Sequence, residues 1–465
     1  MWNQVIKINQ AISGFVWGAP MLILMMGVGI YLSFCTKGIQ LRRFGYAMRN
    51  TIGKVFEKQT AKKGEITPFQ AVTTALAATV GIGNIAGVTW AITAAGSGVL
   101  FWLWVSAIVG MCTKYAEVVL AIRFRERNQW GEWVGGPMYY IRNGLGKKWN
   151  PLAVLFSIFG ALAAFGIGNA VQVGNIANIM NTAIQSVCPG ATAWEKEINL
   201  AIGILVASLT AFVLIGGLGR IGAVTECLVP VMALTYILAC VAVILANLDQ
   251  LIPVLVSIFR GAFEPAAVVG GAGGFTLLRT ITWGVKRGVF SNEAGLGSAP
   301  IAHASSSETN PVKQGMYGIF EVFMDTIVIC TLTGLSLLMS GIELSYGTIG
   351  TMALNAKALG TVFGEQLGIW IIAVGGTLFA IATIFGWALY GTRCCEFVFG
   401  SKSVDIYHIL YVMAVLTGAT MELRLVWDIA DTLNGLMAIP NLVALIGLSD
   451  IIVNLGKNHF SQRSR

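Results

Sequence analysis

Long apolar runs, separated by short charged or Pro/Gly segments, dominate the chain. Stretches such as 11–34, 200–219 and 369–389 contain no Asp, Glu, Lys or Arg. Each run holds about twenty residues, the length that a helix needs to cross about 30 Å of hydrocarbon. The pattern predicts about eleven membrane helices, near 13–34, 68–95, 98–122, 151–186, 198–217, 221–246, 274–304, 314–340, 367–398, 404–423 and 429–454.

Two of these predicted helices contain a small-residue interruption at mid-depth. Residues 79–87 read TVGIGNIAG, and residues 291–298 read SNEAGLGS. Glycine costs about 1 kcal/mol relative to alanine in a helix interior, and unwound backbone exposes polar groups that lipid cannot satisfy. Isolated glycines could merely let helices pack closely. Two polar-flanked interruptions at matching places favour segments that face a cavity.

The interrupted helices are the second and the seventh, so each begins a set of five. The first set covers 68–246 and the second covers 274–454. An odd-numbered repeat that is inserted twice must be inverted, and a broken helix is typical of such transporters. The sequence therefore predicts one all-α polytopic domain over 1–465: a five-plus-five inverted repeat with an extra helix at 13–34.

Composition and charge support a membrane protein and set its expected orientation. The chain is 56% hydrophobic and 11% charged, whereas soluble domains carry about a quarter charged residues. The net charge of +8 comes from loops, mainly 37–63 and 123–148, while the opposite side holds little more than Lys196, Arg260 and Lys357. Positive loops face the cytoplasm. We therefore expect a multi-pass cell-membrane protein, N-terminus outside and C-terminus cytoplasmic, with lipid around it and neither a nucleic-acid partner nor an obligate protein partner.

The first interruption offers groups for two kinds of ion. A half-helix start presents free N–H groups to an anion, and a half-helix end presents free C=O groups to a cation. Gly81 and Gly83 allow close approach to the backbone, Asn84 adds an amide, and Thr79 adds a hydroxyl. An amino-acid zwitterion with a sodium ion suits this arrangement better than a sugar, which carries no full charge.

The second interruption adds ionisable and polar side chains. Phe290, Ser291, Asn292 and Glu293 lie there, and Lys286 with Arg287 comes one turn earlier. An ionisable group at membrane depth is a functional hypothesis by default. Glu293 could meet a substrate ammonium, or it could form a structural pair with one of the two basic residues.

Two further predicted helices carry candidate contacts. In the fourth, Gly166 and Gly168 leave room, while Asn169 and Gln172 project from one face and could bind substrate or tie helices together. In the ninth, Ala380 and Thr383 place a carbonyl and a hydroxyl about one turn apart. Such hard oxygens suit an alkali cation, although a threonine often bonds its own i−4 carbonyl.

Other charged residues lie inside apolar runs. Lys114 and Glu117 are spaced to pair on one helix face. Glu226, Glu321 and Asp325 could relay protons or hold helices together. The eight cysteines show no metal-ligand spacing. No HExxH pair, phosphate loop or Ser-His-acid set is present, so we expect no enzyme. An ion channel is a further alternative that apolar helices alone do not exclude.

Four motifs in order resemble the alanine or glycine:cation symporter family. They are GIGNIAG at 81–87, GGPMYY at 135–140, the string GVKRGVFSNEAGLGSAP at 284–300, and DTLNGLMAIPN at 431–441. The resemblance spans nearly the whole chain. It implies a fold like that of the bacterial leucine transporter with one extra N-terminal helix. It also implies sodium-coupled uptake of small neutral amino acids, alanine and glycine first, by alternating access.

The resemblance also assigns site residues by motif. Thr79, Gly83 and Asn84 would contact the amino acid, Gly166, Gly168 and Gln172 would lie opposite, and Phe290 would close over it. Sodium, as the co-transported ion, would lie between carbonyls near Thr79 and Val80 and the ninth helix at Ala380 and Thr383. Ile384 stands where leucine-transporter relatives often supply a second hydroxyl. A proton could therefore replace sodium. Glutamine as the main substrate is a further alternative, since relatives of this family differ in the side chains that they tolerate.

Overall fold

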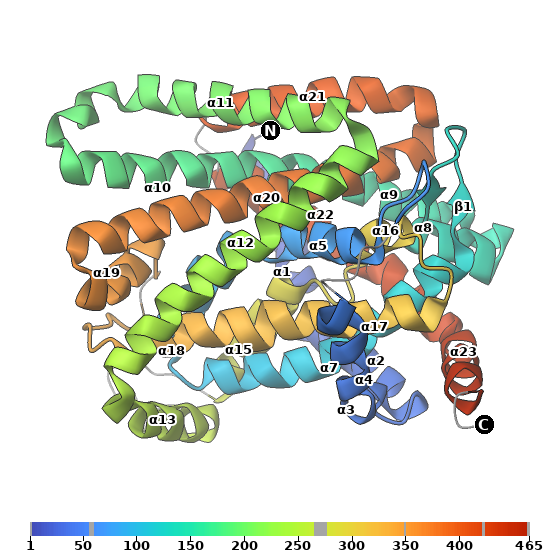
Figure 1. Cartoon of the computed structure of the whole chain (residues 1–465), viewed down its shortest axis with the longest axis horizontal. Helices are drawn as coiled ribbons and strands as arrows, with labels where there is room; N and C mark the ends of the chain where they lie inside the picture. The colour runs from blue at the N-terminus through green and yellow to red at the C-terminus, as the bar shows by residue number, and fades with distance from the viewer. Residues whose placement is uncertain (1, 55–59, 265–276, 348–349, 421–423, 463–465) are drawn as a thin grey trace.

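The protein is seen in a computed structural model that describes residues 2–54, 60–264, 277–347, 350–420 and 424–462 (Figure 1). Most of this part is helical. Its two named strands, β1 (Glu126–Arg127) and β2 (Trp133–Val134), form a small antiparallel hairpin. The all-α prediction missed it because strands of two residues are too short to produce an alternating pattern.

The N-terminal region holds two helices where one was predicted. They are α1 (Trp2–Val16) and α2 (Ala19–Cys35). Gly18 lies between them. Glycine is needed at this position because a Cβ would lie 2.2 Å from the carbonyl oxygen of Gly14. Pro20 lies in the first turn of α2, where a backbone N–H would have no partner within the helix. The connection to the first set contains α3 (Ile39–Arg42), α4 (Phe44–Thr51) and η1 (Ile52–Lys54).

The predicted first set begins with a capped helix. Thr67 and Gln70 cap each other's backbone N–H groups, and Pro68 occupies the first turn of α5. The elements of this half are α5 (Pro68–Thr79), η2 (Ile82–Asn84), α6 (Ala86–Ala95), α7 (Val99–Phe124), α8 (Pro137–Tyr140), η3 (Ile141–Leu145), η4 (Lys147–Trp149), α9 (Asn150–Phe165), η5 (Gly166–Ala170), α10 (Val171–Val187), η6 (Pro189–Trp194), α11 (Glu195–Ile215), α12 (Gly217–Ala246), η7 (Leu248–Gln250) and α13 (Leu251–Phe263).

The second half repeats the pattern of a broken helix followed by long ones. Its elements are α15 (Leu277–Asn292), α16 (Ala299–Ala304), α17 (Pro311–Val322), η8 (Phe323–Cys330), α18 (Thr331–Met339), α19 (Met352–Phe363), α20 (Glu365–Phe399), η9 (Ser401–Ser403), α21 (Val404–Gly418), α22 (Arg424–Gly447) and α23 (Ser449–Ser461). The predicted helix at 429–454 is therefore two helices that meet at Leu448.

Eight helices in the described part are long and apolar enough to cross a membrane. The pair α5 and η2–α6, bent by 61° at its break, would make nine. The count of eleven remains a prediction, because α15 and α21 have 16 and 15 residues. Residues 274–276 and 421–423 of two predicted helices, and 55–59 of the basic first loop, lie outside the described residues.

The two ends of the helices differ in charge. Figure 1 shows α13 and α19 at one end, and β1, α8 and α23 at the opposite end, which we name the hairpin end. At the hairpin end the first and third loops meet, since Glu65 accepts hydrogen bonds from Arg127 at 2.5 Å and from Trp133 at 3.0 Å. Arg260 and Lys357 lie on α13 and α19. The basic loops thus share one end, as the charge pattern requires.

The packing places the broken helices inside and apolar helices outside. All side chains of α16 and nearly all of α5 are buried. By contrast, α11, α12 and α21 expose large apolar side chains, among them Ile215, Leu238 and Ile409. In Figure 1, α11 and α21 run side by side along one edge. An apolar outer face of this kind suits contact with lipid, and the interrupted segments lie in the interior.

Candidate functional site

The first break begins where α5 ends at Thr79. The chain restarts as a short 3-10 turn at Ile82, and Gly81 between them donates its N–H to Asn84 Oδ1 at 2.9 Å. A Cβ on Gly81 would lie 2.9 Å from the hydroxyl oxygen of Thr383. Glycine at this position therefore lets α20 approach the unwound backbone.

The second break spans residues 293–298, between α15 and α16. Glu293 has φ 53°, which is uncommon for a residue other than glycine, and Gly295 and Gly297 also have positive φ. The Glu293 carboxylate accepts a hydrogen bond from the hydroxyl of Ser298. A local turn thus holds an acidic side chain at the end of α15.

The basic residues before this break do not pair with Glu293 among the described contacts. The Arg287 guanidinium lies 4.4 Å from the centre of the Trp90 ring, and the Lys286 ammonium lies 5.6 Å from that of Trp17. Cation–π contacts of this kind stabilise a buried cation modestly. The structure therefore does not show the predicted structural pair.

Asp325, in η8, ties the two breaks together. Its carboxylate accepts hydrogen bonds from Asn84 Nδ2 at 2.6 Å, from the Ser291 hydroxyl at 2.7 Å and from the Thr326 hydroxyl at 2.6 Å. Asn84 Nδ2 also lies 2.9 Å from Ser291 Oγ, and all four side chains are buried. This node of four side chains satisfies buried polar groups next to both breaks.

This node corrects our expectation for Asn84. We expected its amide to face the substrate, but the oxygen caps Gly81 and the nitrogen bonds Asp325. Asn84 is fully buried and is not among the described residues that line the cavity between the breaks. Both ends of the amide are therefore bonded within the protein. The polarity of the segment could not show this difference.

A cavity of about 110 Å³ lies between the two breaks. Predicted residues contribute to its wall as follows: Thr79, Gly83, Gln172, Phe290, Ser291, Glu293 and Thr383. The remaining predicted residues are not among those that line it: Val80, Asn84, Gly166, Gly168, Asn292 and Ala380. The structure thus brings both breaks, the fourth predicted helix and the ninth to one place.

Gln172 presents an open acceptor at this cavity. Its Nε2 donates to the carbonyl of Ile167 at 2.9 Å, inside the π-helical segment η5. Its Oε1 is buried without a hydrogen-bond partner. Buried polar atoms are rarely left unpaired. One end of the amide is thus bonded within its own helical segment rather than to another helix, and a contact of the other end with substrate stays a prediction.

Gly168 brings α20 close to the wall of the cavity. A Cβ on Gly168 would lie 2.2 Å from Trp387 Cβ, so only glycine lets α20 come this close. The Tyr411 hydroxyl donates to the carbonyls of Gly168 and Ile384 at 3.0 and 2.9 Å. Asn169, in the same segment, donates to the Tyr411 carbonyl at 2.8 Å and so ties helices together.

Some cavity residues escaped sequence reasoning. Trp387 lines the cavity from α20, and nothing in its apolar surroundings marks it. Asn434 lines it from α22, with its Oδ1 buried and unpaired. Asn434 falls within the 431–441 motif, which was the available signal. Arg287 also lines the cavity, beside Phe290.

The N-terminal helices support the site from outside. The rings of Trp17 and Phe290 are 5.8 Å apart between centroids, and the Trp17 indole donates to the carbonyl of Asp431 at 3.0 Å. A Cβ on Gly83 would meet the Phe290 ring at 3.5 Å. Phe290 is therefore held between the first break and the extra N-terminal segment.

Oxygen atoms gather where α5 ends against α20. The Thr383 hydroxyl donates to the carbonyl of Phe379 at 2.9 Å, the i−4 bond that threonine commonly forms, and keeps its lone pairs. Ala380 is buried one turn earlier. The carbonyl of Thr79, which ends α5, and that of Val80, which follows it, have no helical N–H group as a hydrogen-bond donor. Hydroxyl and carbonyl oxygens are suitable donors for an alkali cation.

Known proteins resemble the chain over its whole length. The model of the sodium:alanine symporter family matches residues 2–465. The sodium/alanine symporter AgcS of Methanococcus maripaludis is 42% identical over 455 residues, covering 97% of this chain and 96% of that protein. The probable sodium/glutamine symporter GlnT of Bacillus subtilis is 33% identical over 457 residues, covering 96% and 89%.

A solved structure shows the fold. The crystal structure of MhsT in complex with L-phenylalanine aligns with a TM-score of 0.56 at 12% identity, covering 85% of this chain and 99% of that one. This likeness confirms the predicted leucine-transporter-like fold. The inverted repeat and the number of spanning helices stay predictions.

Proposed function

The chain belongs to the sodium:alanine symporter family, and from this premise we propose that it takes up alanine and glycine together with sodium. The observation that carries the proposal is the cavity between the two breaks. Unpaired acceptors, a helix start and a helix end all meet there. A zwitterion and a cation are the ligands that such a set accommodates together.

The cavity can receive the two charges of an amino acid at different walls. The carboxylate fits the N–H groups at Ile82 and Gly83, on the side where Arg287 lies. The ammonium fits Gln172 Oε1 and the Glu293 carboxylate, which are acceptors. Ser291 and Asn292 would support the second break rather than the ligand, since Ser291 donates to Asp325 on η8 and Asn292 accepts from the N–H of Ala294 inside the break.

The size of the cavity favours small side chains. Its volume is about 110 Å³, and the rings of Phe290 and Trp387 occupy two of its walls. A methyl group or a hydrogen fits such a space more readily than the longer glutamine side chain. Glutamine remains the second candidate, because the 33% identical relative is named for it.

Sodium fits beside the substrate, between α5 and α20. Carbonyls near Thr79 and Val80, the carbonyl of Ala380 and the Thr383 hydroxyl would hold it. A cation there would offset the substrate carboxylate and join a broken helix to an unbroken one. Substrate and ion would in this way stabilise the same closed arrangement.

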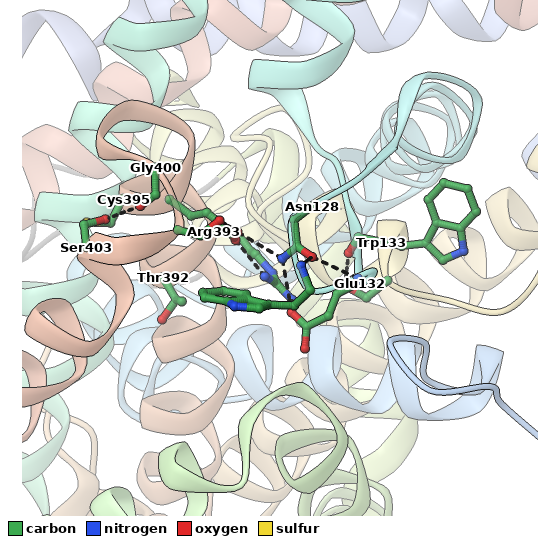
Figure 2. A network of polar contacts seen from close by, with 12 residues as sticks. Asn128, Glu132, Trp133, Thr392, Arg393, Cys395, Gly400 and Ser403 are labelled. Carbon is green, nitrogen blue, oxygen red and sulfur yellow. Dashed lines mark hydrogen bonds and ion pairs between the residues drawn. The ribbon is translucent and has the colours of Figure 1, made fainter.

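The hairpin end is proposed to be cytoplasmic and closed in this structure. Figure 2 shows Arg393 of α20 beside Glu132 of the hairpin, to which it donates at 2.7 Å. Arg393 also donates to Glu396 at 2.7 Å. Asn128 adds a bond to Glu396 at 2.9 Å. The cavity instead reaches Gly350, just before α19. Alternating access would break the Arg393 network when the hairpin end opens.

Radiolabelled alanine uptake into proteoliposomes tests the proposal. An inward sodium gradient should drive accumulation, and a potassium gradient of equal size should not. Excess glycine should compete strongly and excess glutamine weakly. Uptake that ignores both sodium and proton gradients would contradict symport, and current without substrate would favour a channel. Uptake driven by a proton gradient in sodium-free buffer would favour proton coupling.

A further inference from the structure

A second buried polar cluster lies on the hairpin side of the second break. It joins Lys114 of α7, Glu321 of α17 and His303 of α16. Lys114 Nζ is 3.3 Å from Glu321 Oε1, and His303 Nε2 is 3.0 Å from Glu321 Oε2. Their side chains are at most 1% exposed. None of the three lines the cavity between the breaks.

Acidic side chains outnumber basic ones in this cluster. Glu117 and Glu293 also lie near Lys114, so three carboxyl groups surround one ammonium. Glu117 accepts only neutral donors, the Gly295 N–H at 2.9 Å and the Asn441 amide at 2.6 Å. An uncompensated buried charge is costly. A further positive charge inside the cluster would therefore stabilise it.

Other elements packed against His303 supply little compensation. Arg125, beyond the end of α7, donates to the carbonyls of Ala304 and Ser306 at the edge of the cluster. Tyr390 of α20 is neutral, and its buried hydroxyl is unpaired. The helix α5, which also contacts α16, carries no ionisable side chain. A further positive charge would therefore have to be a proton that comes from solvent and binds to a side chain of the cluster.

His303 can accept that charge without a change in the backbone. Gln314 Nε2 lies 2.9 Å from His303 Nδ1, and the Ser306 hydroxyl donates to Gln314 Oε1 at 3.0 Å. In this arrangement Nδ1 accepts, so the imidazole is neutral and Nε2–H donates to Glu321. Turning the Gln314 amide by half a rotation lets Oε1 accept from Nδ1–H and Nε2 donate to Ser306. The same side chains satisfy both protonation states.

We propose that His303 and its neighbours form a proton-binding site distinct from the sodium and substrate sites. A hydronium ion gives its proton to Nδ1 and leaves as water, and no other bond changes. Ser306 Oγ accepts from the N–H of half-buried Glu308, so this serine lies between His303 and the surface of the hairpin end. Opening that end would wet the cluster and release the proton. The effect on transport rests on the proposed function, but the binding of the proton does not.

Histidine NMR reads the proton directly. The chain has three histidines, and the double variant His408→Gln/His459→Gln leaves His303 alone and unaltered. With ¹⁵N-labelled histidine in lipid, spectra recorded from about pH 5 to about pH 9 should show the imidazole change from charged to neutral. A single charge state throughout this range would overturn the proposal. Adding Gln314→Leu, which removes the amide acceptor, should hold the ring neutral.

Uptake measurements test the consequence. Sodium-driven alanine uptake should change about tenfold with the pH at the hairpin end, and His303→Gln should flatten this profile. His408→Gln, on the lipid-exposed helix α21, is the matched control and should keep it. A His303→Gln profile equal to wild type would contradict the link to transport. If wild type shows no alanine uptake, the proposed function fails while the NMR result stands.

Discussion

The two broken helices solve the same problem with different groups. The first break, between α5 and α6, contains no ionisable residue and bends by 61° over two residues. The second spans six residues, carries Glu293 in a left-handed conformation, and follows two basic residues. The first offers mainly backbone to a ligand, and the second offers side chains. In the proposed function, recognition of a zwitterion with a cation would use both kinds of group.

The difference between the breaks also determines how each is held. Asn84 caps the first break internally, and its other bonds go to Ser291 and Asp325. Asp325 lies on η8, yet it accepts from Asn84 after the first bend and from Ser291 at the end of α15, next to the second break. The two broken helices therefore share one buried acceptor. Changes at the shared acceptor should cost more than changes within either break.

The largest expected effect follows from Asp325→Leu. It removes the carboxylate that the donors of Asn84, Ser291 and Thr326 share. The Thr326 hydroxyl then lacks an acceptor among the described contacts, at about 1–3 kcal/mol, while Asn84 and Ser291 keep longer contacts, among them those with each other and with Cys330 Sγ. We expect a strongly lowered melting temperature or loss of folded protein, measured by thermal melting in detergent. Asp325→Asn keeps one acceptor oxygen and should lose less. Equal stability of Asp325→Leu and wild type would show that the breaks are held independently.

Gly168→Ala should have a smaller, still structural effect. The new Cβ would lie 2.2 Å from Trp387 Cβ, and overpacking of this kind costs about 1–3 kcal/mol. Melting temperature and alanine uptake should both fall. Gly375→Ala, on α20, is the control, since nothing lies within 4 Å of its Cβ position. Similar results for both variants would mean that the close approach of α20 does not shape the cavity.

Gln172→Leu should act on binding alone. It removes the free acceptor at the cavity and should weaken alanine binding about tenfold, or 1.4 kcal/mol, with little change in melting temperature. Equilibrium binding of labelled alanine to purified protein measures it. Asn178→Leu, exposed on the same helix, should bind as wild type. If Gln172→Leu also binds normally, the ammonium lies nearer the second break, at Glu293.

The sequence revealed the breaks but not the directions of their side chains. Gly81, Gly83 and the 291–298 segment were predictable because small and polar residues interrupt long apolar runs. The inward turn of Asn84 was not, since an unwound segment has no period that fixes its faces. Trp387 lines the cavity only because Gly168, over two hundred residues earlier, lets α20 approach. Such pairings depend on tertiary contacts that a local pattern does not contain.

The most direct test of the account is the sodium dependence of alanine binding to the purified protein. Sodium should raise alanine affinity, and Thr383→Ala should require about tenfold more sodium for the same effect. Thr417→Ala is the control, because this exposed threonine on α21 makes the same kind of bond to its own helix, at 3.1 Å to the Met413 carbonyl. Alanine binding that is equal with and without sodium, or a wild-type sodium curve in Thr383→Ala, would contradict a substrate and cation that meet at the first break.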